Sequence, residues 1–378
     1  MIRIPFNRPF ATGRELDYIR EAIGTPKFSG DGSFTMECQR ILEQSLGVTK
    51  ALLMTSCTHA LEMAALLLDL KPEDEVILPA FTFVSTANAF VLRGARPIFA
   101  DVRPDTLNID ERLIEKLLTN KTRAIFLLHY AGVGCEMDSI CELAQRRRLA
   151  LIEDNAHGLY ARYRGRFLGT FGEMAALSFH ETKNFTCGEG GALLLNQTRF
   201  IAPAEIIREK GTDRSRFFRG EVDKYNWVAA GSSYLPSDIL AAFLRAQLER
   251  REEIQTARRH LWETYKCELT SWANENKVQL PFVPAECEQS YHMFYLLLPS
   301  LEDRQRLITH LGARGILAVF HYLPLHLSPM GRGLGGRPGD CPVTEDISDR
   351  LLRLPFFTGM SADEQAEVIG TVRSFRCA

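Results

Sequence analysis

A single lysine, Lys183, has the surroundings in this sequence that most favour covalent chemistry. It has Phe179 and Phe185 as near neighbours, and the apolar runs 175–177 and 192–195 lead into and out of its segment. Both runs are typical of short buried strands. An amine among apolar groups loses hydration, so its charged form is disfavoured and a nucleophilic amine results. Lys183 is therefore a candidate for a Schiff base with a carbonyl group, or else an ordinary solvated lysine on a turn.

A carboxylate at Asp154 is the partner that one kind of Schiff-base chemistry needs. Pyridoxal phosphate (PLP) binds to a lysine through its aldehyde, and its ring withdraws electrons only while the pyridine nitrogen stays protonated. A carboxylate against that nitrogen keeps the proton in place. Asp154 directly follows the apolar run 149–152, where the alternative is a simple turn cap. The interval between Asp154 and Lys183 leaves room for two antiparallel strands.

A hydroxyl-rich turn at residues 55–58 is a candidate phosphate site. It lies between an apolar strand at 51–54 and a helix-forming run at 59–68, with Thr58 as the expected N-cap. Backbone N–H groups and the positive end of a helix dipole favour a phosphate at such a turn. Neither a Walker loop nor a dinucleotide fingerprint is present. A plain capped helix is the alternative.

The elements that must position these residues alternate between strand and helix. Strands are expected at 51–54, 75–78, 96–100, 123–128 and 149–152, and helices at 59–68, 84–93 and 137–148. This alternation predicts an α/β protein with a mostly parallel sheet covered on both faces. Ligands collect at the carboxyl ends of such strands. Residues that follow the predicted strands, and are expected to face one crevice, are Thr58, Phe83, His129 and Asp154.

The second half of the sequence predicts a smaller domain after a long helix. That helix is expected from Ser237 to about Leu261, followed by a strand at 291–298 and a helix at 301–314. Ser361 and Glu364 predict a capping box for the last helix. We therefore divide the chain into a large domain with an N-terminal arm, 1–250, and a small C-terminal domain, 251–378.

Composition narrows the class of protein. The chain is 46% hydrophobic and 24% charged, with a net charge of −2, which gives no indication of a nucleic-acid-binding surface. Its nine cysteines are dispersed, without a CxxC pair or a metal-like cluster with histidine. Dispersed thiols favour a reduced, cytoplasmic protein with no metal site. No signal peptide or membrane-spanning run is expected.

Together, these motifs resemble one family over nearly the whole chain. Thr58 after a Ser-Cys turn, Phe83 in Phe-Thr-Phe-Val-Ser-Thr, Glu153-Asp154 and Ser178-Phe-His-Glu-Thr-Lys183 are similar to the DegT/DnrJ/EryC1/StrS sugar aminotransferases. The resemblance implies a PLP enzyme of fold type I, the aspartate-aminotransferase-like fold. This fold has a large domain with a mostly parallel sheet and a smaller C-terminal α+β domain.

The resemblance also implies roles for individual residues. Lys183 would form the Schiff base and shuttle the proton, Asp154 would pair with the pyridine nitrogen and Phe83 would stack on the ring. The positions expected to bind the cofactor are Thr58, His59, Phe83, Asp154, His157, Ser178, Lys183 and Ser233. Two of them depart from the family pattern: His157 replaces a usual glutamine, and Ser233 replaces an asparagine that reaches the phosphate from the neighbouring subunit.

A basic, aromatic segment at 208–219 is either a solvated loop or part of the substrate site. In the family the equivalent loop approaches the active site of the partner subunit, which implies a homodimer with shared sites. Basic and aromatic groups suit a nucleotide diphosphate. The residues expected to bind substrate are Arg214, Arg216, Arg219, Tyr322 and His326.

The segments around 30–35, 61–69, 81–95 and 206–212 are most similar to the C4-aminating branch of the family. This implies amino transfer from L-glutamate to dTDP-4-keto-6-deoxyglucose, giving the galacto-configured 4-amino sugar for lipopolysaccharide or enterobacterial common antigen. Three alternatives stay open: amination of another carbon or nucleotide sugar, a 3-dehydratase, and a non-catalytic sensor. Lys183 disfavours the dehydratase, which has histidine there, and the intact Lys183–Asp154 pair disfavours the sensor.

Overall fold

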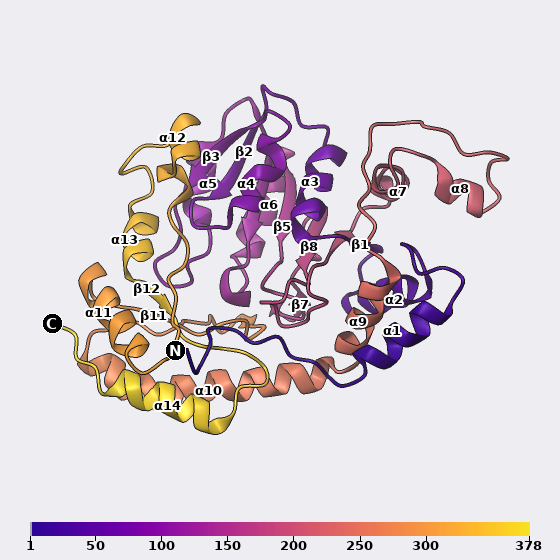
Figure 1. Ribbon diagram of the computed structural model, residues 1–378. Helices are drawn as coiled ribbons and strands as arrows, with labels where there is room; N and C mark the ends of the chain where they lie inside the picture. The colour runs from indigo at the N-terminus through magenta and orange to yellow at the C-terminus, as the bar shows by residue number, and fades with distance from the viewer. Residues whose placement is uncertain (1) are drawn as a thin grey trace.

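A seven-stranded sheet forms the centre of the protein (Figure 1). The computed structural model describes residues 2–378. Strand β9 pairs antiparallel with both of its neighbours, and the other strands of this sheet run in one direction. The mostly parallel sheet predicted from the sequence is therefore confirmed. In spatial order the strands are β1 (Lys50–Met54), β9 (Gly191–Leu195), β8 (Met174–Ser178), β5 (Ala150–Asp154), β4 (Thr122–Leu128), β2 (Glu75–Pro79) and β3 (Arg96–Ala100).

Helices cover both faces of this sheet, because side chains alternate along each strand and both faces are apolar. Leu52 and Phe126 pack towards one layer of helices, whereas Leu53 and Leu127 pack towards the other. The first layer contains α3 (Cys57–Leu67), α4 (Val84–Val91) and α7 (Ile201–Arg208). The second contains α2 (Ser33–Leu46), α5 (Glu111–Leu117), α6 (Met137–Arg147) and α9 (Asp238–Glu249), with α1 (Glu15–Gly24) packed on α9.

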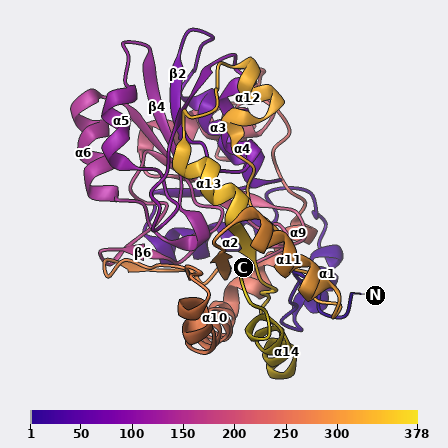
Figure 2. The same cartoon turned by 90° about the vertical axis from the view of Figure 1, so that its left-hand side faces the viewer.

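A second apolar core lies beneath the sheet, where α10 and α14 run side by side (Figures 1 and 2). It combines residues from 261 to 375 with Ile4 of the N-terminal arm, which pairs with Ile316. The predicted capping box at Ser361 and Glu364 begins α14. The elements of this core are α10 (Arg251–Glu275), β11 (Tyr295–Leu297), α11 (Leu301–Gly312), β12 (Leu351–Arg353) and α14 (Ala362–Arg373).

The remaining elements lie at the edges. Helix α8 (Arg214–Phe218) belongs to an arm, residues 209–233, that projects from the body beside α7 (Figure 1). A three-stranded sheet joins β10 (Cys287–Glu288), β6 (Arg162–Tyr163) and β7 (Arg166–Phe167). The short helices are α12 (Pro329–Gly333) and α13 (Pro342–Arg350), with the 3-10 turns η1 (Tyr130–Gly132), η2 (Thr198–Phe200) and η3 (Leu325–Leu327).

Two predicted elements differ in the structure. The helix expected from Ser237 to Leu261 is two helices, α9 and α10, with a break at Arg250. Apolar spacing continues across the break because α9 packs on the large sheet and α10 on the second core, so periodicity alone could not reveal it. The strand expected at 291–298 shortens to β11. The break coincides with the boundary after residue 250, and two domains divided there remain our proposal.

Candidate active site

Lys183 lies in the loop between β8 and β9, held from both sides. Phe179 and Phe185 are fully buried and anchor the loop on the large core. The Lys183 backbone N–H donates to His180 O at 2.9 Å. The next residue, Asn184, donates from Nδ2 to Ser290 O at 2.7 Å. The loop therefore fixes the lysine backbone between the large sheet and the chain that follows α10.

The side chain of Lys183 is partly buried, and its pKa is lowered to about 8, mainly by desolvation. Cys57 and Asp154 act against this shift, while the charge of Arg353 adds to it. A larger share of this amine is neutral near physiological pH than for an exposed lysine. The prediction of a nucleophilic amine thus has a structural basis.

Asp154 is the last residue of β5, and its carboxylate is 4% exposed. Thr86 Oγ1 donates to Asp154 Oδ2 at 2.7 Å, and Ala156 N–H donates to Oδ1 at 3.2 Å. Burial raises the pKa of Asp154 despite these hydrogen bonds. Among residues 2–378 no basic side chain pairs with it, so this carboxylate is suited to a cation that comes with a ligand.

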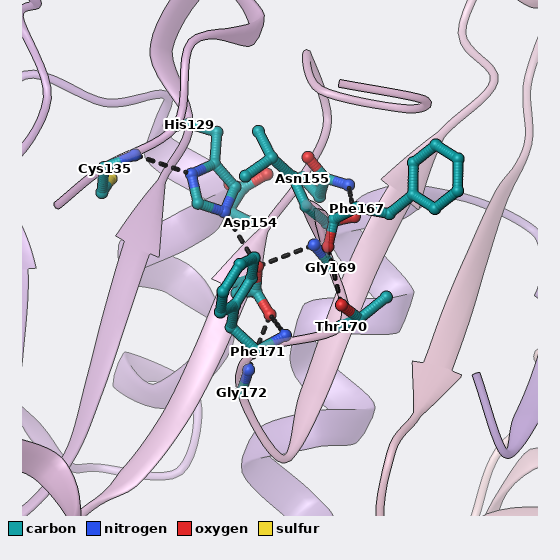
Figure 3. Close-up of polar contacts among 12 residues, drawn as sticks. His129, Cys135, Asp154, Asn155, Phe167, Gly169, Thr170, Phe171 and Gly172 are labelled. Carbon is teal, nitrogen blue, oxygen red and sulfur yellow. Dashed lines mark hydrogen bonds and ion pairs between the residues drawn. The ribbon is translucent and has the colours of Figure 1, made fainter. Parts of the chain in front are cut away.

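The residue before it, Glu153, is held by hydrogen bonds from His129 and from the backbone of the 169–172 loop, whose residues Figure 3 labels. Glu153 accepts backbone hydrogen bonds from Gly169, Phe171 and Gly172, each at 2.7 Å. His129 Nδ1 accepts from the Cys135 N–H at 3.2 Å, so its Nε2 carries the proton and donates to Glu153 at 2.9 Å. His129 is fully buried. The expectation that it faces the crevice is therefore wrong, because its ring supports the carboxylate strand instead.

The predicted turn between β1 and α3 is present, with one correction to its cap. Ser56, not Thr58, is the N-cap: its side chain accepts from the His59 N–H at 3.1 Å. Sequence alone could not choose between two hydroxyl residues that are two positions apart. The first intrahelical bond joins Ala60 N–H to Ser56 O, so the N–H groups of Cys57 and Thr58 have no acceptor within the helix. Ser178, at the end of β8, lies at the same edge of the sheet.

Aromatic residues form the wall opposite this turn. Phe83 is 55% exposed at the start of α4, which leaves one large apolar ring open to a ligand. Tyr322 lies 6.2 Å from it between ring centroids. Tyr322 also belongs to an aromatic cluster. Its neighbouring rings have centroids 5.2 to 6.2 Å apart, and its members are Phe81, Tyr130, Tyr295 and Tyr322.

His157 stacks on His292 with ring centroids 4.3 Å apart. Burial lowers the pKa of both imidazoles well below the usual value, so both are neutral at physiological pH. His292 Nδ1 contacts Asn184 Oδ1 at 2.9 Å, which connects the stack to the residue after Lys183. The sequence analysis missed Thr86, Asn184 and His292. Thr86 lies one helical turn into α4, within the Phe83 motif, and only its position on a helix could have revealed it.

The remaining residues predicted to bind cofactor or substrate are either buried away from Lys183 or exposed on the arm. His326 is fully buried and its Nε2 contacts Glu345 Oε1 at 2.9 Å. Ser233 is exposed and its backbone bridges to Glu209 at the base of the arm. The arm arginines are half exposed and paired with nearby carboxylates. Arg214 pairs with Glu209, Arg216 with Glu221, and Arg219 with Glu221 and with Glu205 of α7.

The residues around Lys183 fit PLP. The buried Asp154 carboxylate lacks a positive partner, which a pyridinium N–H supplies. The start of α3 and Ser178 suit a phosphate, and Lys183 supplies an amine with a lowered pKa. The open ring of Phe83 suits a flat heterocycle. Among the described residues, 2–378, no group of three or more potential ligands suits a metal ion, nor does any helix there have the length and apolarity to cross a membrane.

Comparisons with known proteins agree with this chemistry. The family model of the DegT/DnrJ/EryC1/StrS aminotransferases matches residues 10–373. GDP-perosamine synthase of Caulobacter vibrioides is 32% identical over 98% of this chain and 97% of its own length. The enzyme of the same name from Escherichia coli O157:H7 is 30% identical over 98% of each chain.

Solved structures show the same fold. A putative sugar aminotransferase, Spr1654 from Streptococcus pneumoniae in its PMP form, superposes with a TM-score of 0.92 at 25% identity, covering 98% of both chains. DesV of S. venezuelae gives 0.89 at 29% identity, covering 99% of this chain and 98% of its own. The fold is fold type I, as predicted. The chain belongs to the DegT/DnrJ/EryC1/StrS aminotransferase family and is a PLP-dependent sugar aminotransferase.

Proposed function

We propose that the protein moves an amino group from L-glutamate to C4 of a nucleotide-linked 4-keto-6-deoxyhexose. The preferred substrate is dTDP-4-keto-6-deoxyglucose and the product is dTDP-4-amino-4,6-dideoxygalactose. The observation that carries the proposal is the half-buried Lys183 amine beside the buried Asp154 carboxylate, in a chain of this family. The co-product is 2-oxoglutarate.

When bound, PLP carries the migrating amino group and withdraws electrons from the carbon that loses a proton. Lys183 Nζ is the base that removes and returns that proton, and a pKa of about 8 suits this task near neutral pH. The face of the sugar that Nζ reaches fixes the configuration at C4. Asp154 holds the ring nitrogen proton, and Phe83 and Tyr322 shape the wall against which the sugar lies.

The second subunit of a homodimer completes the site in this proposal. The arm at 209–233 projects from the body and exposes large apolar groups, including Trp227 at 80% and Phe218 at 66%. Exposed aromatic rings on a projecting segment favour burial against a partner. Exposed ion pairs contribute only about 0–1 kcal/mol each, so the arm arginines can exchange their carboxylates for a diphosphate at little cost.

A GDP-linked keto sugar is the second candidate, favoured by the two relatives named GDP-perosamine synthase. The test is to incubate the enzyme, PLP and glutamate with dTDP- and GDP-linked 4-keto-6-deoxy sugars and to determine the amine position and orientation by NMR. An axial C4 amine from the dTDP sugar supports the first candidate. Amination at C3, or turnover of the GDP sugar alone, contradicts it. Lys183→Ala is the matched inactive control.

A further inference from the structure

Strand β12 has two faces that belong to different parts of the protein. Leu352 packs into the second core with α10 and α14, as does Leu354 just after the strand. Leu351 instead packs against the aromatic cluster beneath the active site. Because side chains alternate along a strand, Arg353 shares the face of Leu351. The fold thus directs this arginine towards the catalytic side of the molecule.

The neighbours of Arg353 agree with that direction. Arg353 lies directly across the strand pair from Tyr295, a member of the aromatic cluster, so the two side chains lie on the same face. Its backbone pairs with Val319, two residues before His321. On its other side, the guanidinium lies 4.4 Å from the ring centroid of Phe6 in the N-terminal arm. The group is therefore held between an aromatic ring and the active-site wall.

No anion within the described residues, 2–378, neutralises this guanidinium. Arg353 forms neither a side-chain hydrogen bond nor an ion pair, and its Nε is buried without an acceptor. Across residues 2–378, every other arginine that is at least partly buried has one or the other. Burial lowers the pKa of Arg353, and its positive charge in turn lowers the pKa of Lys183. An unpaired, partly desolvated cation beside a reactive amine is suited to an anionic ligand.

Four anionic groups enter a site of this kind: the cofactor phosphate, the nucleotide diphosphate and the two carboxylates of glutamate. The first two have other binding groups, and the γ-carboxylate is three carbons away from the reacting carbon. The cofactor phosphate suits the start of α3 and Ser178. A nucleotide diphosphate is separated from the reacting sugar carbon by the width of the sugar ring. The α-carboxylate of an amino acid is attached directly to the carbon that carries the migrating amine, so it must lie beside Lys183. A guanidinium fork binds a carboxylate through two parallel hydrogen bonds.

We propose that Arg353 binds the α-carboxylate of the amino donor. This inference rests on the proposed transamination, and it identifies a donor-specific residue that the sugar half of the reaction does not require. The sugar substrate has no carboxylate at its reacting carbon. Loss of Arg353 therefore affects one half-reaction and spares the other.

The test measures the two half-reactions separately in Arg353→Gln and Arg353→Lys. With the PLP-loaded enzyme and glutamate alone, loss of the cofactor's near-visible absorbance reports the donor step. We expect the glutamate concentration for half-saturation to rise about 100-fold in Arg353→Gln, since two charge-assisted hydrogen bonds are lost. The Arg353→Lys variant keeps the charge without the fork and falls in between. Return of the absorbance with keto sugar stays within a few-fold of wild type.

A binding measurement supplies a readout that needs no turnover. Calorimetry of glutarate, an unreactive dicarboxylate, with the pyridoxamine-loaded proteins should show at least about tenfold weaker binding for Arg353→Gln. Arg350→Gln is the matched control, because Arg350 lies three residues earlier and pairs only with Asp346. It should leave both half-reactions and glutarate binding unchanged. Circular dichroism confirms that each variant is folded.

The inference fails under any of the following four results. An equal loss in both half-reactions makes Arg353 a structural residue, and a loss in the sugar step alone places it on the diphosphate. If neither step changes in the variants, Arg353 does not bind the donor. The same conclusion follows if the wild type accepts amines that lack a carboxylate as well as it accepts glutamate. If the wild type reacts with glutamate but with no keto sugar, the proposed function fails instead, while the Arg353 comparison still stands.

Discussion

The reactivity of Lys183 comes from surroundings that disfavour its charged form. Desolvation is the largest cause of its lowered pKa, and the unpaired charge of Arg353 adds to it. Asp154 is buried with a raised pKa for the same reason. At the scale of single residues, burial disfavours the charged forms of both Lys183 and Asp154. A bound cofactor would provide a partner for each of them.

Lys183→Ala should abolish turnover and leave the fold intact, because the side chain is only partly buried and Phe179 and Phe185 still anchor the loop. Borohydride reduction of the loaded wild type should fix the cofactor to a peptide that contains Lys183, detectable by mass spectrometry. Attachment to a different lysine would contradict the assignment. Lys210→Ala, on the exposed arm, is the control and should label normally.

The pKa of Lys183 also has a measurable effect on stability. Its usual value is 10.5 and its folded value about 8, so between these pH values the unfolded chain binds more protons and stability rises with pH. Below pH 8 the destabilisation is complete. Lys183→Met should therefore make the cofactor-free protein more stable at pH 7 by about 1–3 kcal/mol. Urea unfolding should show this gain shrinking as the pH approaches 10, and an equal gain at both pH values would refute the linkage.

Asp154→Asn should keep the structure, since Thr86 can still donate to the remaining amide oxygen. A neutral amide does not hold the pyridinium proton, so turnover should fall by several orders of magnitude, comparable with the loss of one preorganised electrostatic partner. Steady-state kinetics checks this, with far-ultraviolet circular dichroism as the folding control. Activity within a few-fold of wild type would mean that Asp154 only caps a turn.

Sequence identified Lys183 and Asp154 because each follows an apolar strand within a short motif. Sequence did not indicate Arg353. Its proposed role depends on which face of β12 it occupies and on the lack of an anionic partner for its guanidinium. Thr86, Asn184 and His292 contact the site through side-chain directions that strand and helix periodicity does not specify. Conversely, His326 shares an aromatic segment with Tyr322, yet the turn at Leu325–Leu327 directs it into the core beside Glu345.

At the scale of elements, buried carboxylates join segments that are far apart in sequence. Asp238, in the first turn of α9, accepts from the Phe34 N–H at 3.2 Å and from the Thr35 N–H at 2.7 Å. It therefore caps α2 across the core. Gly32 must be a glycine here, since a Cβ would lie 2.3 Å from the Asp238 carboxylate. This contact joins α2 to α9.

Asp238→Ala should destabilise the protein by about 2–4 kcal/mol, because the cap is lost and buried N–H groups of α2 are left without an acceptor. Chemical denaturation provides the measurement. Asp363→Ala, in the exposed first turn of α14, is the matched control and should change stability by no more than about 0.5 kcal/mol. Equal effects of the two substitutions would show that the α2–α9 contact adds no more to the free energy of unfolding than an exposed aspartate does.

The alternation of strands with α3, α4 and α6 was predictable because their apolar periods are strong, whereas α2 and α5 were not predicted. The ends of the predicted elements were less predictable: the N-cap of α3 lay two residues from the predicted one, and the break at Arg250 carries no proline or glycine signal. For the cap, two hydroxyl residues are nearly equal in local energy. For the break, a continuous helix and two helices are nearly equal. In both cases tertiary packing decides between them.

At the scale of the whole molecule, the arm at 209–233 carries aromatic side chains that a single chain does not bury. Its aromatic groups are exposed, and helix α8, which carries Arg214 and Arg216, projects from the body (Figure 1). We propose that it reaches the active site of a second copy. Sequence indicated the basic, aromatic composition of this segment but not its projection.

Mixing two inactive variants tests that arrangement. One carries Lys183→Ala, and the other carries glutamine at Arg214, Arg216 and Arg219. Each heterodimer has one site with an intact lysine and an intact arm, so a random mixture should recover about a quarter of wild-type activity after subunit exchange. No recovery, or a fully active monomer by light scattering, would place each site within one chain. The two variants kept apart are the controls.

The N-terminal arm has a practical consequence for handling the protein. The Arg3 and Ile4 N–H groups both donate to Gly315 O, the Phe6 carbonyl accepts from the Phe356 N–H, and the Phe6 ring covers the Arg353 guanidinium. A fusion tag placed directly before these residues disturbs the strand that carries the donor-binding group. Trimming the first ten residues is likewise not a neutral shortening. An expression vector for this enzyme should separate these residues from any tag by a cleavable spacer.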